Sequence, residues 1–418
     1  LFAGTEFGVF FSMNSGKRWT QLKGGIPVIA VRDLAIQKRE NDLVVATFGR
    51  GFYILDDITP LRLLTETSLD QELLSYPVKE SWMFIPEEPL GLPEKSFQGH
   101  SFFTAPNPPA GAVFTYYLKE EIKTRKKARQ EKEKELIKEE KDVFYPSWED
   151  LREEDREEEP AIAITVTDEE GNVVRRITGP ATAGFHRVSW DLRYPATTPV
   201  QLETKSDEDD PFTPKPIGPL AAPGTYKVTI AKRVESALTP IGESQSFQAT
   251  ALGTASLPAT DRAALLEFQR KTAKLQRAVM GSVQILDETK KRLDHLKKAL
   301  DDTPGADPKM SEEARLLALR LKDLQTALNG DPVRKKYNEP TPPAIADRVE
   351  QIVFGHWTTT APATGTHRRN YDIAAEEFTT VLADLRKLME VDLKSLEDRA
   401  EVAGAPWTPG RVPKWTKE

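Results

Sequence analysis

Two kinds of hydrophobic pattern divide the chain. In the first part, short apolar runs alternate with polar positions, as where Tyr226, Val228 and Ile230 are separated by Lys and Thr. Alternation with a period of two is typical of a half-buried antiparallel strand. From Pro258 onward, leucines recur at near-heptad spacing, which is typical of amphipathic helices. The pattern therefore predicts a mixed, multidomain chain in which a β-rich region precedes an α-helical one.

Strand patterns with turn signals between them recur through residues 113–252. They cover 113–118, 161–168, 173–177, 184–192, 224–231 and 246–251. Short strands at this spacing predict an immunoglobulin-like or fibronectin-III-like β-sandwich. The preceding residues 61–112 are rich in proline, and we expect an irregular connection that packs against its neighbours, with short strands near 81–84 and 100–103.

A charged segment, residues 119–160, interrupts the predicted sandwich. It is dense in Lys, Arg and Glu, and opposite charges four positions apart favour a solvated helix. We expect a helical insertion between two strands, with a partner-docking arm as the alternative. Glu offsets most of the basic residues, so nucleic-acid binding is not expected. A second acidic stretch, 207–210, predicts a surface loop rather than a calcium site.

The helical region, residues 258–400, predicts an antiparallel bundle. Apolar stripes place helices at about 261–300, 311–328, 343–354 and 371–400, separated by Pro- and Gly-containing breaks. The remaining residues, 401–418, predict an extended tail. We expect its two tryptophans, Trp407 and Trp415, to pack back onto the body of the protein.

Residues 1–60 contain an internal repeat. Aligning Gly8 with Gly51 gives a period of 43 residues, inside the roughly 40–50-residue range of β-propeller blades. Each copy predicts an apolar strand, a tight turn containing glycine, and an aromatic-rich strand. Propeller blades bury their faces only against neighbouring blades, so one and a half repeats cannot close a propeller. We therefore expect that these are the last blades of an incomplete propeller, and that upstream sequence or a second chain supplies the others.

An Asp-box pattern, S-x-D-x-G-x-x-W, lies between the two copies. Its positions are taken by Ser12, Asn14 in the Asp place, Gly16 and Trp19. We expect the Ser12 and Asn14 side chains to bond nearby backbone N–H groups and Gly16 to adopt a left-handed turn. Trp19 is then expected to fill the space between blades. The motif is interpreted as structural, with a ligand role as the minor alternative.

Taken together, these stretches resemble the sortilin-type Asp-box (BNR) β-propeller proteins of bacteria, which are often labelled glycosyl hydrolase or sialidase-like. The stretches that carry the resemblance are 31–57, 107–112, 190–194, 223–226 and 407–411. The resemblance implies that the chain is the C-terminal region of a larger extracytoplasmic protein, whether periplasmic, cell-surface or secreted. The absence of an initiator Met before Leu1 fits that expectation.

The resemblance leaves two functions open. The first is a non-catalytic assembly or binding region that braces the propeller and mediates partner or self contacts. The alternative is part of a secreted glycoside hydrolase that acts on polysaccharide, with its catalytic carboxylates in upstream blades. Whether the whole protein is an enzyme is therefore left open. The partners expected are the missing blades, a polysaccharide or protein ligand, or a second copy of the chain.

Composition narrows the chemistry available to the chain. It has 418 residues and no cysteine, which excludes disulfides, thiolate nucleophiles and Cys-ligated zinc. Its 58 basic and 65 acidic residues give a net charge of -7, so a broad basic surface for nucleic acid is not expected. No apolar run approaches the roughly 18 residues of a membrane span. The five histidines are scattered, and we predict neither a metal site nor a cofactor.

The candidate binding residues are Arg50, Asp56 and Asp57, which lie in and after the second repeat. Glycoside hydrolysis needs two carboxyl groups about 5–9 Å apart, whereas adjacent residues of an extended segment point to opposite faces. We therefore predict no catalytic residue. The two aspartates are interpreted as solvated strand-end groups that form an ion pair with Arg50.

Three other residues invite a functional interpretation that the sequence does not favour. His100 and His186 have no Ser or Asp partner at motif spacing, so a catalytic triad is not predicted. Trp190 is interpreted as a core residue of the sandwich rather than as a sugar platform.

Overall fold

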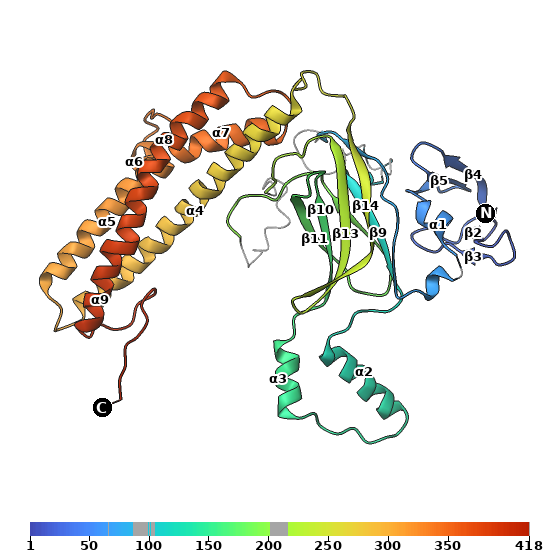
Figure 1. The fold of residues 1–418 in the computed structure, drawn as a ribbon, viewed down its shortest axis with the longest axis horizontal. Helices are drawn as coiled ribbons and strands as arrows, with labels where there is room; N and C mark the ends of the chain where they lie inside the picture. Colours follow the sequence, from blue (N-terminus) through green and yellow to red (C-terminus); the bar gives the residue numbers. More distant parts are fainter. Residues whose placement is uncertain (66, 87–98, 100, 102–104, 201–215, 418) are drawn as a thin grey trace. The chain divides into compact units, whose positions relative to one another are not determined.

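The computed structural model describes residues 1–65, 67–86, 99, 101, 105–200 and 216–417. It combines several β-sheets with a helical C-terminal region (Figure 1). The described residues form two compact units. One holds those up to Arg193 together with Pro223–Leu252, and the other holds those of 194–222 and 253–417. His100, the acidic stretch 207–210 and most of the strand expected at 100–103 lie outside the described residues.

Two three-stranded antiparallel sheets open the chain. The first is formed by β1 (Phe2–Thr5), β2 (Gly8–Phe11) and β3 (Thr20–Gln21), and the second by β4 (Val31–Gln37), β5 (Asp42–Thr47) and β6 (Phe52–Leu55). The hairpins β1–β2 and β5–β6 correspond to the two copies of the internal repeat. A small core of Val9, Leu43, Val45 and Ile58, each at most 1% exposed, joins the two sheets. The helix α1 (Thr59–Leu63) and the 3-10 turn η1 (Ser68–Asp70) follow.

Two further sheets pack face to face. One has the order β12-β9-β7 and the other the order β11-β10-β13-β14-β8. Their strands are β7 (Leu73–Ser75), β8 (Ser81–Met83), β9 (Ala112–Leu118), β10 (Ala161–Thr167), β11 (Val173–Gly179), β12 (Gly184–Trp190), β13 (Gly224–Val234) and β14 (Ala237–Ala251). Phe114 of β9 meets Phe247 of β14 with ring centroids 5.7 Å apart, and Trp190 meets Tyr226 at 5.1 Å. Trp190 is fully buried, which confirms its interpretation as a core residue.

The chain changes sheets between β7 and β8. β7 pairs antiparallel with β9, whereas β8 pairs parallel with the end of β14. β14 is longer than the strand expected at 246–251, because its first part, Ala237–Ile241, continues the hairpin with β13. A register shift opposite Val228–Ile230 separates the two parts, and it leaves 242–244 without partners in β13.

The charged insertion forms an arm of two helices, α2 (Arg125–Lys138) and α3 (Trp148–Arg156), between β9 and β10 (Figure 1). Neither helix contains a buried residue. The helices are joined instead by ion pairs, Arg125 with Glu153 and Arg129 with Glu154. β9 and β10 belong to different sheets, so the arm connects the two sheets and is not a loop within one of them.

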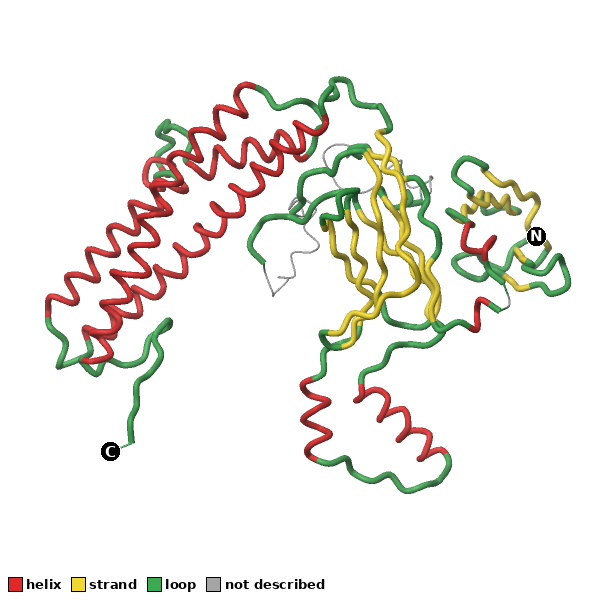
Figure 2. Tube along the Cα trace, viewed as in Figure 1, coloured by secondary structure: helices red, strands yellow, loops and turns green. Residues whose placement is uncertain are grey.

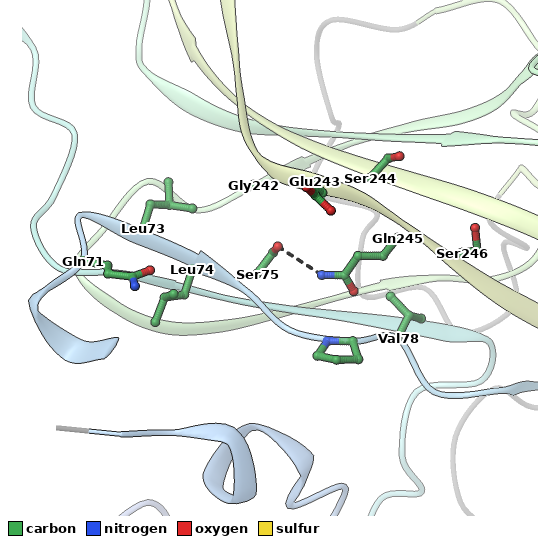
Figure 3. A pocket seen from close by; sticks show the side chains of 11 residues that line it. Gln71, Leu73, Leu74, Ser75, Val78, Gly242, Glu243, Ser244, Gln245 and Ser246 are labelled. Carbon is green, nitrogen blue, oxygen red and sulfur yellow. Dashed lines mark hydrogen bonds between the residues drawn. The ribbon is translucent and has the colours of Figure 1, made fainter. Parts of the chain in front are cut away.

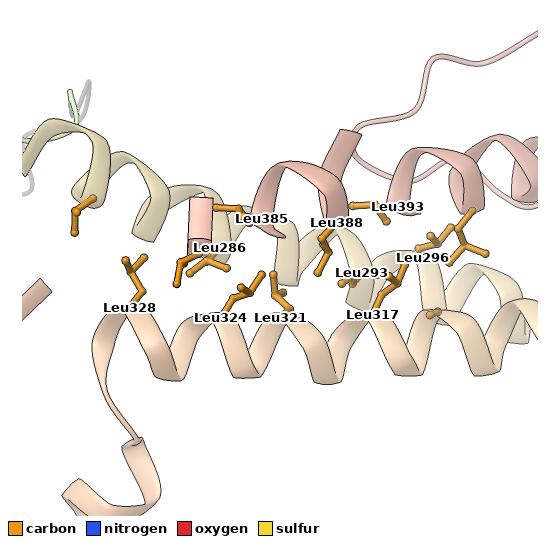
Figure 4. Packing of buried hydrophobic residues seen from close by; sticks show 14 of the residues in the cluster. Leu286, Leu293, Leu296, Leu317, Leu321, Leu324, Leu328, Leu385, Leu388 and Leu393 are labelled. Carbon is orange, nitrogen blue, oxygen red and sulfur yellow. The ribbon is translucent and has the colours of Figure 1, made fainter. Parts of the chain in front are cut away.

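The second unit is a bundle of long helices that run along one another (Figure 2). It contains α4 (Arg262–Asp301), α5 (Pro308–Asn329), α6 (Pro332–Lys336), α7 (Ile345–Trp357), α8 (Gly365–Lys387), the π-helix η4 (Leu388–Leu393) and α9 (Lys394–Val402). Asp261, Asp307 and Thr364 cap α4, α5 and α8 through backbone N–H groups. Leucines at helical spacing on α5 pack against leucines of α4, α8 and η4 (Figure 4). This is the arrangement that the apolar stripes predict.

The tail after α9 is held by Arg411 and not by the two tryptophans that the sequence analysis expected to be buried. Trp407 and Trp415 remain 61% and 82% exposed, so the expectation that their rings pack back was wrong. Arg411 fastens the tail, because its buried guanidinium pairs with Glu401 and donates to the carbonyls of Ala405 and Pro406. Because the guanidinium of Arg411 has several donors, it binds all three of these groups at once. The tail is therefore held without burial of the two indole rings. Among the described helices, none is long and apolar enough to cross a bilayer.

Candidate functional site

The turn at residues 12–19 directs its polar atoms inward. Ser12 Oγ accepts the N–H of Gly16 at 2.8 Å, and Asn14 Oδ1 accepts the N–H of Arg18 at 2.8 Å. Ser12 also donates its hydroxyl to Asn14 Oδ1, so the amide oxygen serves two donors. Gly16 has a φ of 90°, the left-handed conformation in which glycine is favoured. The Trp19 ring lies beside Gly16 and keeps a partly exposed face.

Asp57 fixes the backbone between β6 and α1. Its Oδ1 accepts the N–H of Thr59 at 3.1 Å and also the Thr59 hydroxyl. Its own N–H donates to the carboxylate of Asp42 at 2.8 Å. The residue has a φ of 43°, which a short polar side chain tolerates. The carboxylate of Asp57 is therefore occupied by local backbone and hydroxyl donors.

Asp56 lies in a cluster of charges rather than beside a second free carboxyl group. Burial, and then the negative charge of Asp42, raise the pKa of Asp56, while Arg187 and Lys79 act in the opposite direction. Arg187 of β12 donates to the carbonyl oxygens of Asp56 and Asp57, both at 2.7 Å. In the described part of the chain, no ion pair joins Arg50 to either aspartate. Arg50 precedes β6 whereas the aspartates follow it, so the strand separates the charges and Arg187 faces the aspartates instead.

A second contact between distant residues lies at the turn between β4 and β5. We call it and the Arg187 contact with Asp56 and Asp57 the two clamps. Lys79 pairs with the carboxylate of Glu40 and also donates to its carbonyl oxygen at 3.2 Å. The hydrogen bond from Lys79 is the main cause that lowers the pKa of Glu40, against a smaller effect of burial. Lys79 and Arg187 are far from their partners in sequence. No motif signals these contacts, so sequence analysis did not find them.

These groups fasten the β4–β5–β6 sheet. The Asp57 carboxylate is already hydrogen-bonded, and Asp56 faces cations of the clamp. His186 of β12 is bound through Nε2 to the carbonyl of Thr182 at 2.6 Å and lies beside Tyr116. Within the described residues, no group of three or more His, Asp or Glu side chains is placed to hold a metal ion.

An apolar surface, which we call the open face, covers the other side of the same sheet. It consists of Val44 and Ala46 of β5 with their cross-strand partners Ile54 and Phe52 of β6. Phe52 is 75% and Ile54 is 60% exposed. Alternation places Leu43 and Val45 on the opposite side, where they are buried in the small core.

The first sheet shows what covers an equivalent face. There the cross-strand pairs Phe2–Phe11 and Gly4–Val9 take the corresponding positions of the repeat. This face packs onto β4. A Cβ added to Gly4 would lie 2.6 Å from Val31 Cγ1, and Val9 is fully buried. The first sheet therefore packs this face onto the second sheet, whereas the equivalent face of the second sheet points away from the first. The face that is covered in the first copy is bare in the second.

A cavity of about 490 Å³ lies between β7 and the middle of β14 (Figure 3). We call it the β7–β14 seam. It is lined by Gln71, Leu73, Leu74, Ser75, Pro77, Val78 and residues 242–246. Gln245 Nε2 donates to Ser75 Oγ across it at 3.1 Å.

Comparison with known proteins gives little further guidance. No protein-family model matches the chain, and no curated protein matches it. Among solved structures the chain is similar to PorZ, an essential bacterial surface component of the type-IX secretion system of Porphyromonas gingivalis. The similarity has 12% sequence identity and a TM-score of 0.15, and it covers 60% of this chain and 28% of that one.

Proposed function

We propose that this chain is the non-catalytic C-terminal assembly region of a larger extracytoplasmic β-propeller protein. In this proposal β1–β6 belong to propeller blades, the two packed sheets form an immunoglobulin-like sandwich, and the open face docks a further blade-type sheet of the same protein. The observation that carries the proposal is the bare face of the second repeat, whose equivalent is buried in the first. The extracytoplasmic location rests on the resemblance alone.

The energetics of the two sheets support a missing neighbour. Repeats that stack in one dimension depend on nearest-neighbour interfaces for their stability. The core between the sheets contains only four fully buried apolar side chains. Removing a Phe or Ile side chain completely from water stabilises a protein by roughly 1.5–3 kcal/mol. Covering Phe52 and Ile54 with a further sheet therefore offers up to about half of the stabilisation that the four core side chains provide.

The polar clamps support the bracing part of the proposal. Arg187 and Lys79 hold one end of the β4–β5–β6 sheet, where the β4–β5 turn lies beside the end of β6, through four bonds to Asp56, Asp57 and Glu40. Charge-assisted hydrogen bonds are directional, so they fix the orientation of the sheet as well as its position. The carboxylate of Glu40 is engaged by Lys79 and that of Asp57 by Thr59, which favours a structural role for these two groups over a catalytic one.

Exposure of the open face is the property to test. The variant Phe52→Ser/Ile54→Ser removes its apolar side chains, and Phe7→Ser is the matched control, because Phe7 is an exposed aromatic in the β1–β2 turn. We expect residues 1–418 to bind the dye bis-ANS and to self-associate with rising concentration in light scattering. The double variant should lose both properties, and Phe7→Ser should keep them.

A second measurement asks whether a blade covers the face in the natural polypeptide. Hydrogen exchange of residues 43–55 is compared between residues 1–418 and the full-length protein from the same gene. Docking should slow exchange in the full-length protein by about tenfold or more, which corresponds to about 1.4 kcal/mol. Equal exchange in the two proteins, or a double variant that binds bis-ANS as the parent does, would contradict the proposal.

A further inference from the structure

Three aromatic side chains are exposed at the far end of the α2–α3 arm. α2 begins shortly after β9 and α3 ends shortly before β10, so the residues that join the two helices lie at the end of the arm remote from these strands (Figure 1). We call residues 139–150 the arm tip. Within it Phe144 is 84%, Tyr145 is 77% and Trp148 is 70% exposed. Since one aromatic side chain has roughly 150–250 Å² of surface, on the order of 400 Å² of aromatic surface faces solvent.

These rings do not contribute to the fold of the arm. The two helices contain no buried residue, and ion pairs join them. The largest apolar patch on a typical soluble protein measures roughly 300–600 Å² and is often functional. Phe, Tyr and Trp are also the residues that are enriched at the centres of protein–protein interfaces. The rings are therefore placed for a contact outside the arm.

Polar bonds hold the backbone of the arm tip while the rings point outward. Ser147 Oγ accepts the N–H of Asp150 at 3.1 Å, and the Asp150 carboxylate accepts the N–H of Ser147 at 3.3 Å, which fixes the start of α3. The rings of Tyr145 and Trp148 meet edge to face with their centroids 6.0 Å apart. A surface that is already held in one conformation loses less entropy when it binds.

The charges around the rings indicate the kind of partner. Residues 139–150 contain five acidic side chains and one basic one, a net charge of -4. The residues of α2, 125–138, contain seven basic and three acidic side chains, a net charge of +4. Negative charge is thus concentrated beside the rings. Such a surface repels the phosphates of nucleic acids and of anionic lipids, and it is complementary to lysine and arginine.

We propose that the arm tip binds a protein partner through an apolar surface of that partner that is bordered by lysine and arginine. Phe144, Tyr145 and Trp148 enter the apolar surface and supply the affinity, because a few buried aromatic residues carry most of the binding free energy of an interface. Asp142 and Glu149 flank the rings and are exposed. They face the basic border and select the partner, because electrostatic complementarity mainly gives specificity and a fast association rate.

This inference does not rest on the proposed assembly function. The arm tip lies between β9 and β10 in the chain, whereas the open face lies on β5 and β6. The variant Phe52→Ser/Ile54→Ser removes the open face and keeps the arm tip, so the two proposals can fail separately.

The test uses residues 1–418 and a fluorescent helical peptide as the model partner. The peptide has a stripe of leucines flanked by lysines, and it therefore presents the proposed chemistry. One comparison peptide has glutamate in place of every lysine. A second has the composition of the lysine peptide in scrambled order, without a stripe. Binding is followed by fluorescence anisotropy at low and at high salt.

Two variants of the arm tip separate the apolar contribution from the charged one. The ring variant, Phe144→Ser/Trp148→Ser, removes two rings. The charge variant, Asp142→Asn/Glu149→Gln, keeps the rings and removes two charges. All four side chains are exposed, and none belongs to the capping box. The matched control is Phe354→Ser, which removes an 80% exposed ring from α7.

We expect saturable binding of the lysine peptide that weakens by about tenfold or more in the ring variant. Binding should stay unchanged in Phe354→Ser and in Phe52→Ser/Ile54→Ser. The charge variant should bind more weakly than the parent at low salt, and the difference should shrink at high salt because salt screens exposed charges. The glutamate and scrambled peptides should bind the parent more weakly than the lysine peptide.

Four results would overturn the proposal. They are absence of saturable binding, equal binding of the glutamate or scrambled peptide, a ring variant that binds as the parent does, and loss of binding in Phe52→Ser/Ile54→Ser. Neutral phosphatidylcholine vesicles test a different partner. If the parent sediments with them and the ring variant does not, the arm tip contacts a membrane and the proposal is wrong. The peptide comparisons on the parent chain decide the matter even if the ring variant does not fold.

Discussion

Acidification should weaken the helical unit through a buried pair of histidines. His356 of α7 is 1% exposed, and its Nε2 lies 2.8 Å from Nδ1 of His367 on α8. Burial, followed by the positive charges that His367 and Arg368 carry, lowers the pKa of His356 to about 4. Burial also lowers the pKa of His367. The Nδ1 atom of His356 is buried without a hydrogen-bond partner, so a proton placed there finds no acceptor.

The sign and size of the effect follow from proton linkage. An unfolded histidine titrates near pH 6.5, so between pH 6.5 and 4 the unfolded chain binds more protons than the folded one at this position. Stability is therefore fully present above pH 6.5 and is lost as the pH falls toward 4. A fall in pKa from 6.5 to about 4 corresponds to roughly 3 kcal/mol in all, of which about 2 kcal/mol is lost by pH 5.

Urea unfolding followed by far-UV circular dichroism reports the helices and measures this loss. The free energy of unfolding is compared at about pH 7.5 and about pH 5 for the parent protein, for His356→Gln, and for His295→Gln as the control on an exposed surface of α4. The parent and His295→Gln should lose about 2 kcal/mol more than His356→Gln between the two pH values. An equal loss in the parent and His356→Gln would refute the assignment of acid sensitivity to this pair.

Three further variants, two of them with a matched control variant, test other contacts. Gly111→Ala should lower stability by about 3 kcal/mol or more in thermal unfolding, because φ is 107° and the new Cβ would lie 2.0 Å from the Trp190 carbonyl oxygen. Gly171→Ala, with open space around it, should cost about 1 kcal/mol. Arg292→Met strands the buried carboxylate of Glu397 and should cost about 3–5 kcal/mol in urea unfolding. Lys298→Met at an exposed pair should cost under about 1 kcal/mol. Arg129→Met should speed proteolysis within 139–147 while the melting temperature moves by less than about 2 °C, because the arm has no core.

Local patterns predicted the elements that local interactions form. The alternation around Tyr226 predicted β13, and the leucine stripes predicted α4 and α5 to within a few residues. The short strand β7 was missed, because three residues carry too little periodicity and its pairing partner β9 lies far along the chain. The first part of β14 was missed because it contains Pro240 and is followed by Gly242, residues that ordinarily interrupt strands.

The sequence of the arm contains a signal for α3 that the prediction did not use. The mixed charges predicted α2, but α3 has few apolar residues and was not predicted as a separate helix. Its start is marked by a capping box, in which Ser147 and Asp150 exchange side-chain-to-backbone hydrogen bonds. Capping chemistry thus locates a solvated helix that hydrophobic periodicity does not.

In the candidate site, too, the sequence predicted what neighbouring residues form and missed what residues far apart in the chain form. The repeat predicted both hairpins, and alternation within them specifies two faces for each sheet. It does not specify which face a neighbour covers, because that depends on the direction in which the sheets stack. Gly4 settles the direction, since its missing side chain lets Val31 approach. The predicted ion pair between Arg50 and the aspartates was wrong for a related reason. Arg50 is close to the aspartates in sequence, but folding brings Arg187 of another sheet to them instead.

The β4–β5–β6 sheet therefore carries two surfaces with different chemistry, and each suits a different kind of contact. One end of the sheet is held by Arg187 and Lys79 through directional, charge-assisted bonds, which set how the sheet is turned. Its open face presents the exposed side chains of Phe52 and Ile54, whose apolar contact contributes free energy but little orientation. A sheet that docks on Phe52 and Ile54 would thus gain its stability from the open face and its alignment from clamps it does not touch.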